Sequence, residues 1–287
     1  MWARLVVASL WLLHFLPLPL LARLGEGFGM LAYAFARERG RVARINLKLC
    51  FPELSDTARE RLLKQHCRAF GRGALENGIA WWASKARLQR VCQIEGIEYL
   101  EKFLGKPLIV LAPHFAGLDI AGIRLSSEYP GVSMYRRPKD DFLNDLLLRG
   151  RKRFGMATMV PHRQGLRPVV KAIRNGLPFY YLPDRDHGER DSVFASFFGV
   201  PAATATTLSR LARLTHAAVV PCVARQLSNG YVARFYPAWD GYPSGDDAAD
   251  AVRMNAFIEE RIREMPEQYF WNQKRFKTRP PGEKEFY

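Results

Sequence analysis

The chain has 287 residues, of which 43 are Lys or Arg and 28 are Asp or Glu, so its formal net charge at pH 7 is +15. Hydrophobic residues make up 48% of the chain, which is enough for a sizeable core and excludes a disordered basic tail. A charge of this size predicts an anionic partner, such as nucleic acid, phospholipid, an acidic protein or a phosphorylated substrate. The four cysteines form no CxxC pair, so we expect reduced side chains in a domain that faces the cytosol, and no metal site.

The N-terminal segment 5–24 is almost continuously apolar and is flanked by Arg4 and Arg23. It is just long enough to span a bilayer, but Pro17 and Pro19 would kink it. It also lacks the small-x-small cleavage site of a signal peptide. We therefore expect an uncleaved membrane anchor over residues 1–24, either spanning the bilayer or embedded in one leaflet.

The remaining chain divides into a helical extension at 25–90 that packs on the core, and a core at 91–287 with a basic C-terminal tail. Pro52 is expected to end one helix and Ser55 to cap the next. Strands are predicted at 91–94, 107–112, 132–135, 158–161, 178–182, 219–224 and 232–236, and helices at 118–127, 142–154, 166–175, 206–214 and 248–265. This alternation predicts an α/β fold with a largely parallel, mixed sheet flanked by helices. In such sheets, functional residues gather in the loops beyond the carboxyl ends of the strands.

The first such loop carries His114 between Pro113 and Gly117, with Asp119 five residues after the histidine. An imidazole accepts a hydroxyl proton best when a carboxylate holds its other ring nitrogen. With His114 in the turn and Asp119 in the first turn of the following helix, we expect the two side chains to converge as a general base and its orienting partner. The alternative is a turn histidine beside an acid that stabilises a helix N-terminus.

Two further loops carry charged residues. Arg136 and Arg137 follow the predicted strand at 132–135 and could bind phosphate or stabilise an oxyanion. Asp184, Arg185 and Asp186 follow the strand at 178–182. The two aspartates could orient an arginine or bind a metal, and the alternative is an Asx-turn with a surface ion pair.

Two other groups of side chains are notable. The cations Arg149, Arg151, Lys152 and Arg153 lie at the end of the predicted helix 142–154, where we expect them to face an acidic protein or lipid headgroups. The aromatic residues Phe194, Phe197 and Phe198 are expected in the core, with the lining of an acyl channel as the alternative.

Together these blocks resemble the late acyltransferases of lipid A biosynthesis, the lauroyl and myristoyl transferases of Gram-negative inner membranes, in the wider lysophospholipid acyltransferase superfamily. The resemblance covers nearly the whole chain. It rests on the N-terminal anchor, the HxxxxD block at 114–119, the block at 135–138, the block at 183–207, and the C-terminal blocks PEQYFW at 266–271 and RFKTRP at 275–280. HxxxxD is shared by glycerolipid acyltransferases generally, whereas the last two groups of blocks are more specific to the lipid A branch.

The resemblance implies transfer of a fatty acyl group from a thioester on acyl carrier protein to the hydroxyl of a 3-hydroxyacyl chain on a lipid A precursor. His114 would deprotonate this hydroxyl, and Asp119 would hold the imidazole and stabilise the imidazolium. Arg137, or backbone amides near Gly117, would stabilise the oxyanion. No acyl-enzyme is needed, and the sequence contains no GxSxG nucleophile elbow.

The remaining site residues are assigned to substrate binding: Arg136, Arg137, Gly117, Asp184, Arg185 and Asp186. The doubled Arg136–Arg137 departs from the single arginine before proline of the family, and Arg137 is favoured for that role because it precedes Pro138. No cofactor and no metal are expected. The expected location is the inner membrane, in contact with its lipids, with the catalytic domain facing the cytoplasm.

Two other functions remain open at this point. A glycerolipid acyltransferase of the lysophosphatidate type would use the same histidine and differ only in its acceptor, although the C-terminal blocks count against it. A membrane-tethered nucleic-acid-binding protein would also use the positive charge, but no aromatic-basic stripe or nucleic-acid module is found, so no nucleic-acid partner is expected.

Overall fold

The computed structural model describes residues 2–287. Its N-terminal part contains the helices α1 (Trp2–Leu13), α2 (Leu18–Phe35), α3 (Arg37–Cys50), α4 (Asp56–Trp82) and α5 (Lys85–Val91). The apolar N-terminal segment is therefore two helices, because Pro17 stands at the N-cap of α2 with an extended backbone. Within residues 2–287, no helix combines the length and the apolar character needed to cross a membrane.

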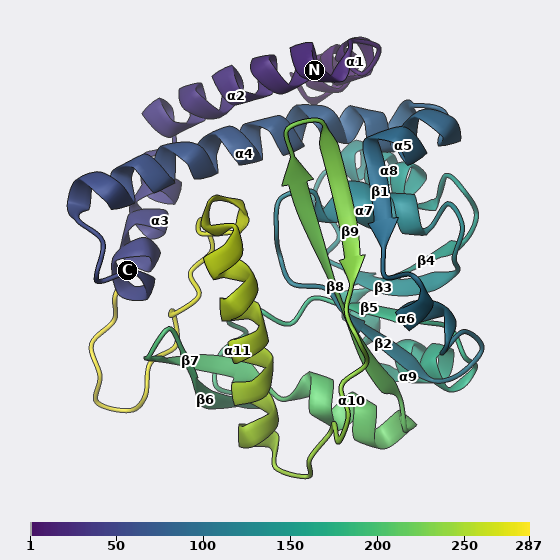
Figure 1. Cartoon of the computed structure of the whole chain (residues 1–287), viewed down its shortest axis with the longest axis vertical. Coiled ribbons are helices and arrows are strands. Elements are labelled where there is room, and N and C mark those ends of the chain that lie inside the picture. Colours follow the sequence, from purple (N-terminus) through teal and green to yellow (C-terminus); the bar gives the residue numbers. More distant parts are fainter. Residues whose placement is uncertain (1) are drawn as a thin grey trace.

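Helix α2 lies along α4, and glycines let the two backbones touch (Figure 1). A β-carbon at Gly29 would lie 2.0 Å from the carbonyl oxygen of Cys67, and one at Gly71 would lie 2.2 Å from the carbonyl oxygen of Gly25. Ser55 caps α4 as predicted, accepting a hydrogen bond from the backbone N–H of Ala58 at 3.2 Å. The predicted domain division at residue 24 stays a prediction, and α2 runs across it.

The central sheet has seven strands in the order β1-β9-β8-β2-β5-β3-β4. They are β1 (Cys92–Glu95), β2 (Leu108–Leu111), β3 (Gly131–Tyr135), β4 (Ala157–Pro161), β5 (Phe179–Tyr181), β8 (Ala218–Leu227) and β9 (Gly230–Phe235). All neighbouring strands are parallel except β8 and β9. The predicted α/β fold with a largely parallel, mixed sheet is therefore confirmed. A short antiparallel pair, β6 (Ser192–Phe197) and β7 (Val200–Ala205), was not predicted.

Helices cover both faces of this sheet. They are α6 (Glu98–Glu101), α7 (Leu118–Leu125), α8 (Asp141–Lys152), α9 (Arg167–Arg174), α10 (Thr207–Thr215) and α11 (Asp247–Glu264), with short 3-10 turns η1 (His162–Gln164) and η2 (Pro266–Gln268). Alternate residues of β2 enter two cores: Ile109 packs with α9, α10 and α11, and Val110 packs with α7. Phe197 and Phe198 are buried in the first core as predicted, whereas Phe194 is exposed, so its predicted place in the core is wrong.

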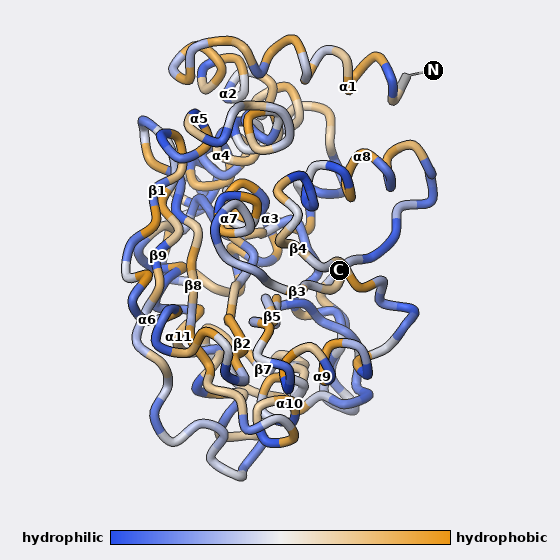
Figure 2. Tube along the Cα trace, turned by 90° about the vertical axis from the view of Figure 1, so that its right-hand side faces the viewer, coloured by the Kyte–Doolittle hydropathy of each residue, from blue (hydrophilic) through white to orange (hydrophobic). Residues whose placement is uncertain are grey.

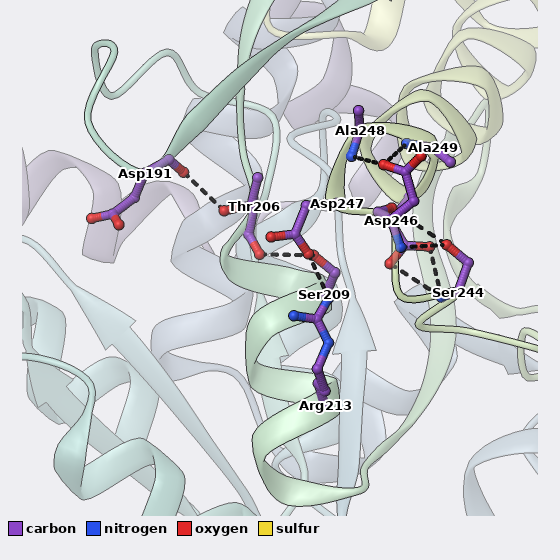
Figure 3. A network of polar contacts seen from close by, with 10 residues as sticks. Asp191, Thr206, Ser209, Arg213, Ser244, Asp246, Asp247, Ala248 and Ala249 are labelled. Atoms are coloured by element: carbon purple, nitrogen blue, oxygen red, sulfur yellow. Dashed lines mark hydrogen bonds and ion pairs between the residues drawn. The ribbon is translucent and has the colours of Figure 1, made fainter.

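A polar network ties α10 to α11 on the face away from α7 (Figure 3). Asp247 accepts hydrogen bonds from Ser209 at 3.0 Å and from Arg213 at 2.6 Å. Asp246 caps α11 by accepting from the first N–H groups of the helix. These contacts hold α10 and α11 together on one face of the sheet.

Candidate functional site

His114 lies in the loop between β2 and α7, at the carboxyl edge of the sheet. Its Nδ1 is 2.7 Å from Oδ1 of Asp184, and its backbone N–H donates to Oδ2 of the same carboxylate at 3.1 Å. Asp184 follows β5, which runs parallel to β2 with Leu111 paired to Tyr181. The two loops therefore leave the sheet side by side, and both side chains are buried.

This contact decides which ring nitrogen of His114 is available to accept a proton. An ionised carboxylate only accepts, so we assign the proton to Nδ1, which leaves the lone pair on Nε2. Burial raises the pKa of Asp184, but its charge interaction and hydrogen bonds with His114 outweigh this and lower the pKa below its usual value. Such a pair holds an imidazole in the tautomer of a general base and stabilises the imidazolium that proton transfer creates.

The expected pairing of His114 with Asp119 needs correction. Asp119 lies in the first turn of α7, and its carboxylate accepts from Nη2 of Arg151 on α8 at 2.5 Å. The position on Nδ1 is already taken by Asp184, which comes from the neighbouring strand. Sequence reasoning missed this partner because the two residues are 70 positions apart.

Gly117 marks the turn into α7, and both its backbone conformation and its surroundings require glycine. Its φ of +87° is in the left-handed region, and a β-carbon would lie 2.4 Å from the ring of Tyr231. The Tyr231 hydroxyl is held by a buried chain in which it donates to Glu76 and accepts from Gln226 at 2.9 Å. Arg72 in turn lies 3.0 Å from the Glu76 carboxylate. Helix α4 therefore supports the His114 loop indirectly, because Glu76 on α4 holds the Tyr231 ring against which Gly117 packs.

The C-terminal PEQYFW block holds the same loop from another side. The backbone N–H of Ala116 donates to the carbonyl of Gln268 at 2.7 Å, and the N–H of Phe270 donates to the carbonyl of His114 at 3.2 Å. The Phe270 ring also lies edge-on to the imidazole, 5.5 Å between centroids. The block was recognised only as a family feature, and its contacts with the histidine could not be read from the sequence.

The other expected site residues form no hydrogen bond or ion pair with the His114–Asp184 pair in the described structure. Arg137 is exposed and pairs with Asp141 at 2.5 Å, so neither expected aspartate orients it. Asp186 accepts from the N–H of Gly188 at 2.9 Å, which is an Asx-turn, and from both the N–H and the hydroxyl of Thr278 in the C-terminal tail. Arg136 and Arg185 are exposed.

Within residues 2–287, no cluster of acidic, cysteine or histidine side chains has the form of a metal site.

The cations at the end of α8 do not form the free surface that was expected. Arg151 is bound to Asp119, and Arg153 donates to the carbonyls of Ala80 and Ala83 at the end of α4. Burial lowers the pKa of Arg153. Both arginines therefore connect α8 to the core, and only Arg149 and Lys152 are exposed.

A cavity of about 130 Å³ lies beside this site, between α7 and the strands β3 and β4. Most of its lining is apolar, and its two charged residues are Asp119 and Arg151. The lining also includes Ala112 and Leu182, which lie two residues before His114 and Asp184. The remaining lining residues are Leu118, Ala121, Gly122, Ile123, Leu125, Ser126, Tyr129, Gly131, Val132, Ser133, Met134, Ala157, Thr158, Met159, Tyr180, Cys222 and Ala224.

Comparison with known proteins identifies the family. The family described as bacterial lipid A biosynthesis acyltransferase matches residues 1–278. The chain belongs to this family. It is 35% identical to the lipid A biosynthesis lauroyltransferase of Escherichia coli strain K12 over 96% of this chain and 91% of that protein. It is also 35% identical to the palmitoleoyltransferase of that strain, over 97% and 92% of the two chains.

The myristoyltransferase of the same strain is 30% identical, over 92% of this chain and 82% of that protein. The solved 1-acyl-sn-glycerophosphate acyltransferase of Thermotoga maritima aligns with a TM-score of 0.40 and 13% identity, over 80% and 97% of the two chains. Membership of the lipid A acyltransferase family shows that the chain is an enzyme that transfers acyl groups.

The geometry predicts that Asp184→Asn lowers kcat of this acyltransferase by about 10²–10⁴-fold, because the amide cannot stabilise an imidazolium. Asp119→Asn, which leaves the His114–Asp184 contact in place, should have a smaller effect. Steady-state kinetics on both purified variants checks this, with circular dichroism to confirm that each is folded. An Asp184→Asn enzyme with wild-type kcat would contradict the assignment.

Proposed function

We propose that this chain transfers a fatty acyl group from an acyl carrier protein thioester to the hydroxyl of a 3-hydroxyacyl chain on a lipid A precursor, without an acyl-enzyme. The observation that supports this most strongly is the buried His114–Asp184 pair beside an apolar cavity. No residue in the described range 2–287 forms a hydrogen bond with Nε2 of His114. Family membership supports the lipid A acceptor, since the relatives are lipid A acyltransferases.

The proposed reaction is a single displacement at the thioester carbonyl. Nε2 of His114 takes the proton of the acceptor hydroxyl as its oxygen attacks the carbonyl carbon. Asp184 stabilises the imidazolium. The tetrahedral intermediate then collapses, the C–S bond breaks, and the imidazolium returns its proton to the leaving thiolate. The products are an ester on the acceptor and the free thiol of the carrier.

The oxyanion requires a donor near His114, and the Gly117 amide is the best candidate. In the described part of the chain, the N–H of Gly117 has no hydrogen-bond acceptor, whereas that of Ala116 is used by Gln268. Arg137, the other candidate, is paired with Asp141 at the surface. A preorganised amide at such a position stabilises the charge that develops in the transition state.

The cavity beside α7 is proposed to hold the donor acyl chain. Gly122 on α7 lines it, and a β-carbon there would meet no atom within 4 Å. The β-carbon position is therefore open, and we propose that a larger side chain there extends into the cavity. Burial of each CH2 group of an acyl chain contributes about 0.8 kcal/mol, so the space available sets the preferred chain length.

Gly122→Leu should shift donor preference toward shorter acyl chains, changing the ratio of kcat/KM between short and long donors by about tenfold. Gly122→Ala should give a smaller shift in the same direction. Competition assays with a series of acyl carrier thioesters measure the ratio. An unchanged ratio in Gly122→Leu would contradict this role of the cavity.

The overall function is tested by incubating purified enzyme with acyl carrier thioester and lipid A precursor and following products by mass spectrometry. Wild type should add one acyl chain, and His114→Ala should lose at least about 10²-fold in rate while its melting temperature stays close to that of wild type. Lysophosphatidate as the acceptor tests the glycerolipid alternative. Efficient acylation of lysophosphatidate alone, or a fully active His114→Ala enzyme, would contradict the proposal.

The enzyme is further proposed to bind the inner membrane, with its catalytic domain on the cytoplasmic side. Large apolar side chains are exposed along both N-terminal helices. Figure 2 shows that α1 and α2 lie at one end of the molecule and carry many hydrophobic residues. On α2 they recur every three or four residues, at Leu20, Leu24, Phe28, Leu31 and Phe35. This spacing places them on one face of the helix, as expected for a helix lying in the membrane interface.

Replacing both Leu24 and Phe28 by Glu should reduce the fraction of protein that floats with vesicles containing anionic phospholipid. Leu214→Glu is the matched control, because Leu214 is equally exposed but lies on α10. We expect the control to float as wild type does. Equal flotation of all three proteins would contradict membrane binding through α2.

A further inference from the structure

Four side chains that can carry positive charge gather at the carboxyl edge of the sheet beyond His114. Arg136 directly follows β3, and His162 directly follows β4. The parallel register pairs Tyr135 with Pro161, the last residues of these strands, so the two side chains start from adjacent positions. The loop after β5, on the other side of β3, supplies Arg185 and His187.

These four groups are exposed, and among residues 2–287 no acid forms an ion pair with any of them. In the described structure, none of the four side chains forms a hydrogen bond or an ion pair. The two neighbouring acids are occupied elsewhere: Asp184 by His114, and Asp186 by Thr278 and Gly188. Two arginines and two imidazoles that are not paired with an acid favour the binding of an anion.

The groups are close enough to affect each other's protonation. Desolvation and the charges of Arg185 and Arg136 lower the pKa of His162. Desolvation also lowers the pKa of His187, and the charges of His162, Arg185 and His114 act in the same direction, while Asp186 acts against them. Without a ligand, both imidazoles are therefore held toward their neutral form.

We propose that Arg136, His162, Arg185 and His187 form a binding site for the phosphate group of the acceptor, and that the two histidines take up protons when this group binds. The proposal rests on the proposed function for the identity of the acceptor. The two arginines supply permanent charge, and a dianionic phosphate adds the opposite charge that the imidazoles lack.

The direction of the pH dependence follows from this. A bound dianion raises the pKa of each imidazole relative to the free protein. Binding therefore strengthens as the pH falls from above the bound-state pKa to below the free-state pKa, and each histidine that gains charge contributes to it. His114 is not counted among the histidines that take up a proton here, because its Nδ1 is bound to Asp184.

Histidine ring resonances of the full chain in detergent, followed through a pH titration with and without sulfate, test the site directly. Sulfate is a dianion throughout this pH range, and chloride keeps the ionic strength constant. We expect sulfate to raise the apparent pKa of His162 and His187 by about half a unit or more. His216, exposed at the opposite edge of the sheet before β8, is the internal control and should not shift. Equal shifts of all three histidines, or no shift, would overturn the proposal.

Kinetics then identify which substrate carries the phosphate. His162→Gln and His187→Gln should each raise KM for the lipid A precursor by about two- to tenfold, with kcat nearly unchanged and the difference from wild type growing as the pH falls. His216→Asn should match wild type. An increase in the KM for the carrier thioester instead would overturn the assignment to the acceptor. The sulfate titration needs no acyl transfer, so it can succeed even where the proposed function fails.

Discussion

The hydrogen bond between His114 and Asp184 joins two loops that are 70 residues apart and leave adjacent parallel strands. Both side chains are buried, so neither can exchange its partner for water. A buried carboxylate without a partner is costly, and this cost keeps the imidazole in one orientation and one tautomer. The cavity and the loops at the carboxyl edge of the sheet can be assigned roles only from their positions relative to this fixed imidazole.

The rest of the structure supports that contact from several directions. Gly117 rests on the Tyr231 ring, and the buried chain to Glu76 and Arg72 holds this ring against α4. Burial raises the pKa of Glu76, which makes its hydrogen bonds to Tyr231 and Arg72 essential. The C-terminal block fastens the loop through the carbonyl of Gln268. Helix α4 and the chain terminus therefore affect the geometry of the histidine although neither supplies a reacting group.

The sequence predicted the sheet and most helices because apolar strands alternate with amphipathic segments, and this periodicity is local. It also predicted that His114 lies in a turn after a buried strand, because this pattern is local. The carboxylate partner was misassigned to Asp119, because strand order decides which loops meet and no local pattern encodes it. The contacts of Arg151 and Arg153 could not be predicted for the same reason, because their partners lie on α7 and α4. The hairpin of β6 and β7 was missed because β7 is built mostly from small residues and shows little alternation.

The proposed chemistry depends on Asp184 fixing His114 with its proton on Nδ1 and its lone pair on Nε2. The most direct test is the ¹⁵N chemical shifts of the His114 ring at a pH where it is neutral, measured in the wild-type enzyme. We expect a protonated Nδ1 and an unprotonated Nε2. A neutral His114 that carries its proton on Nε2 would contradict this assignment, because that nitrogen could not then accept the hydroxyl proton in the proposed reaction.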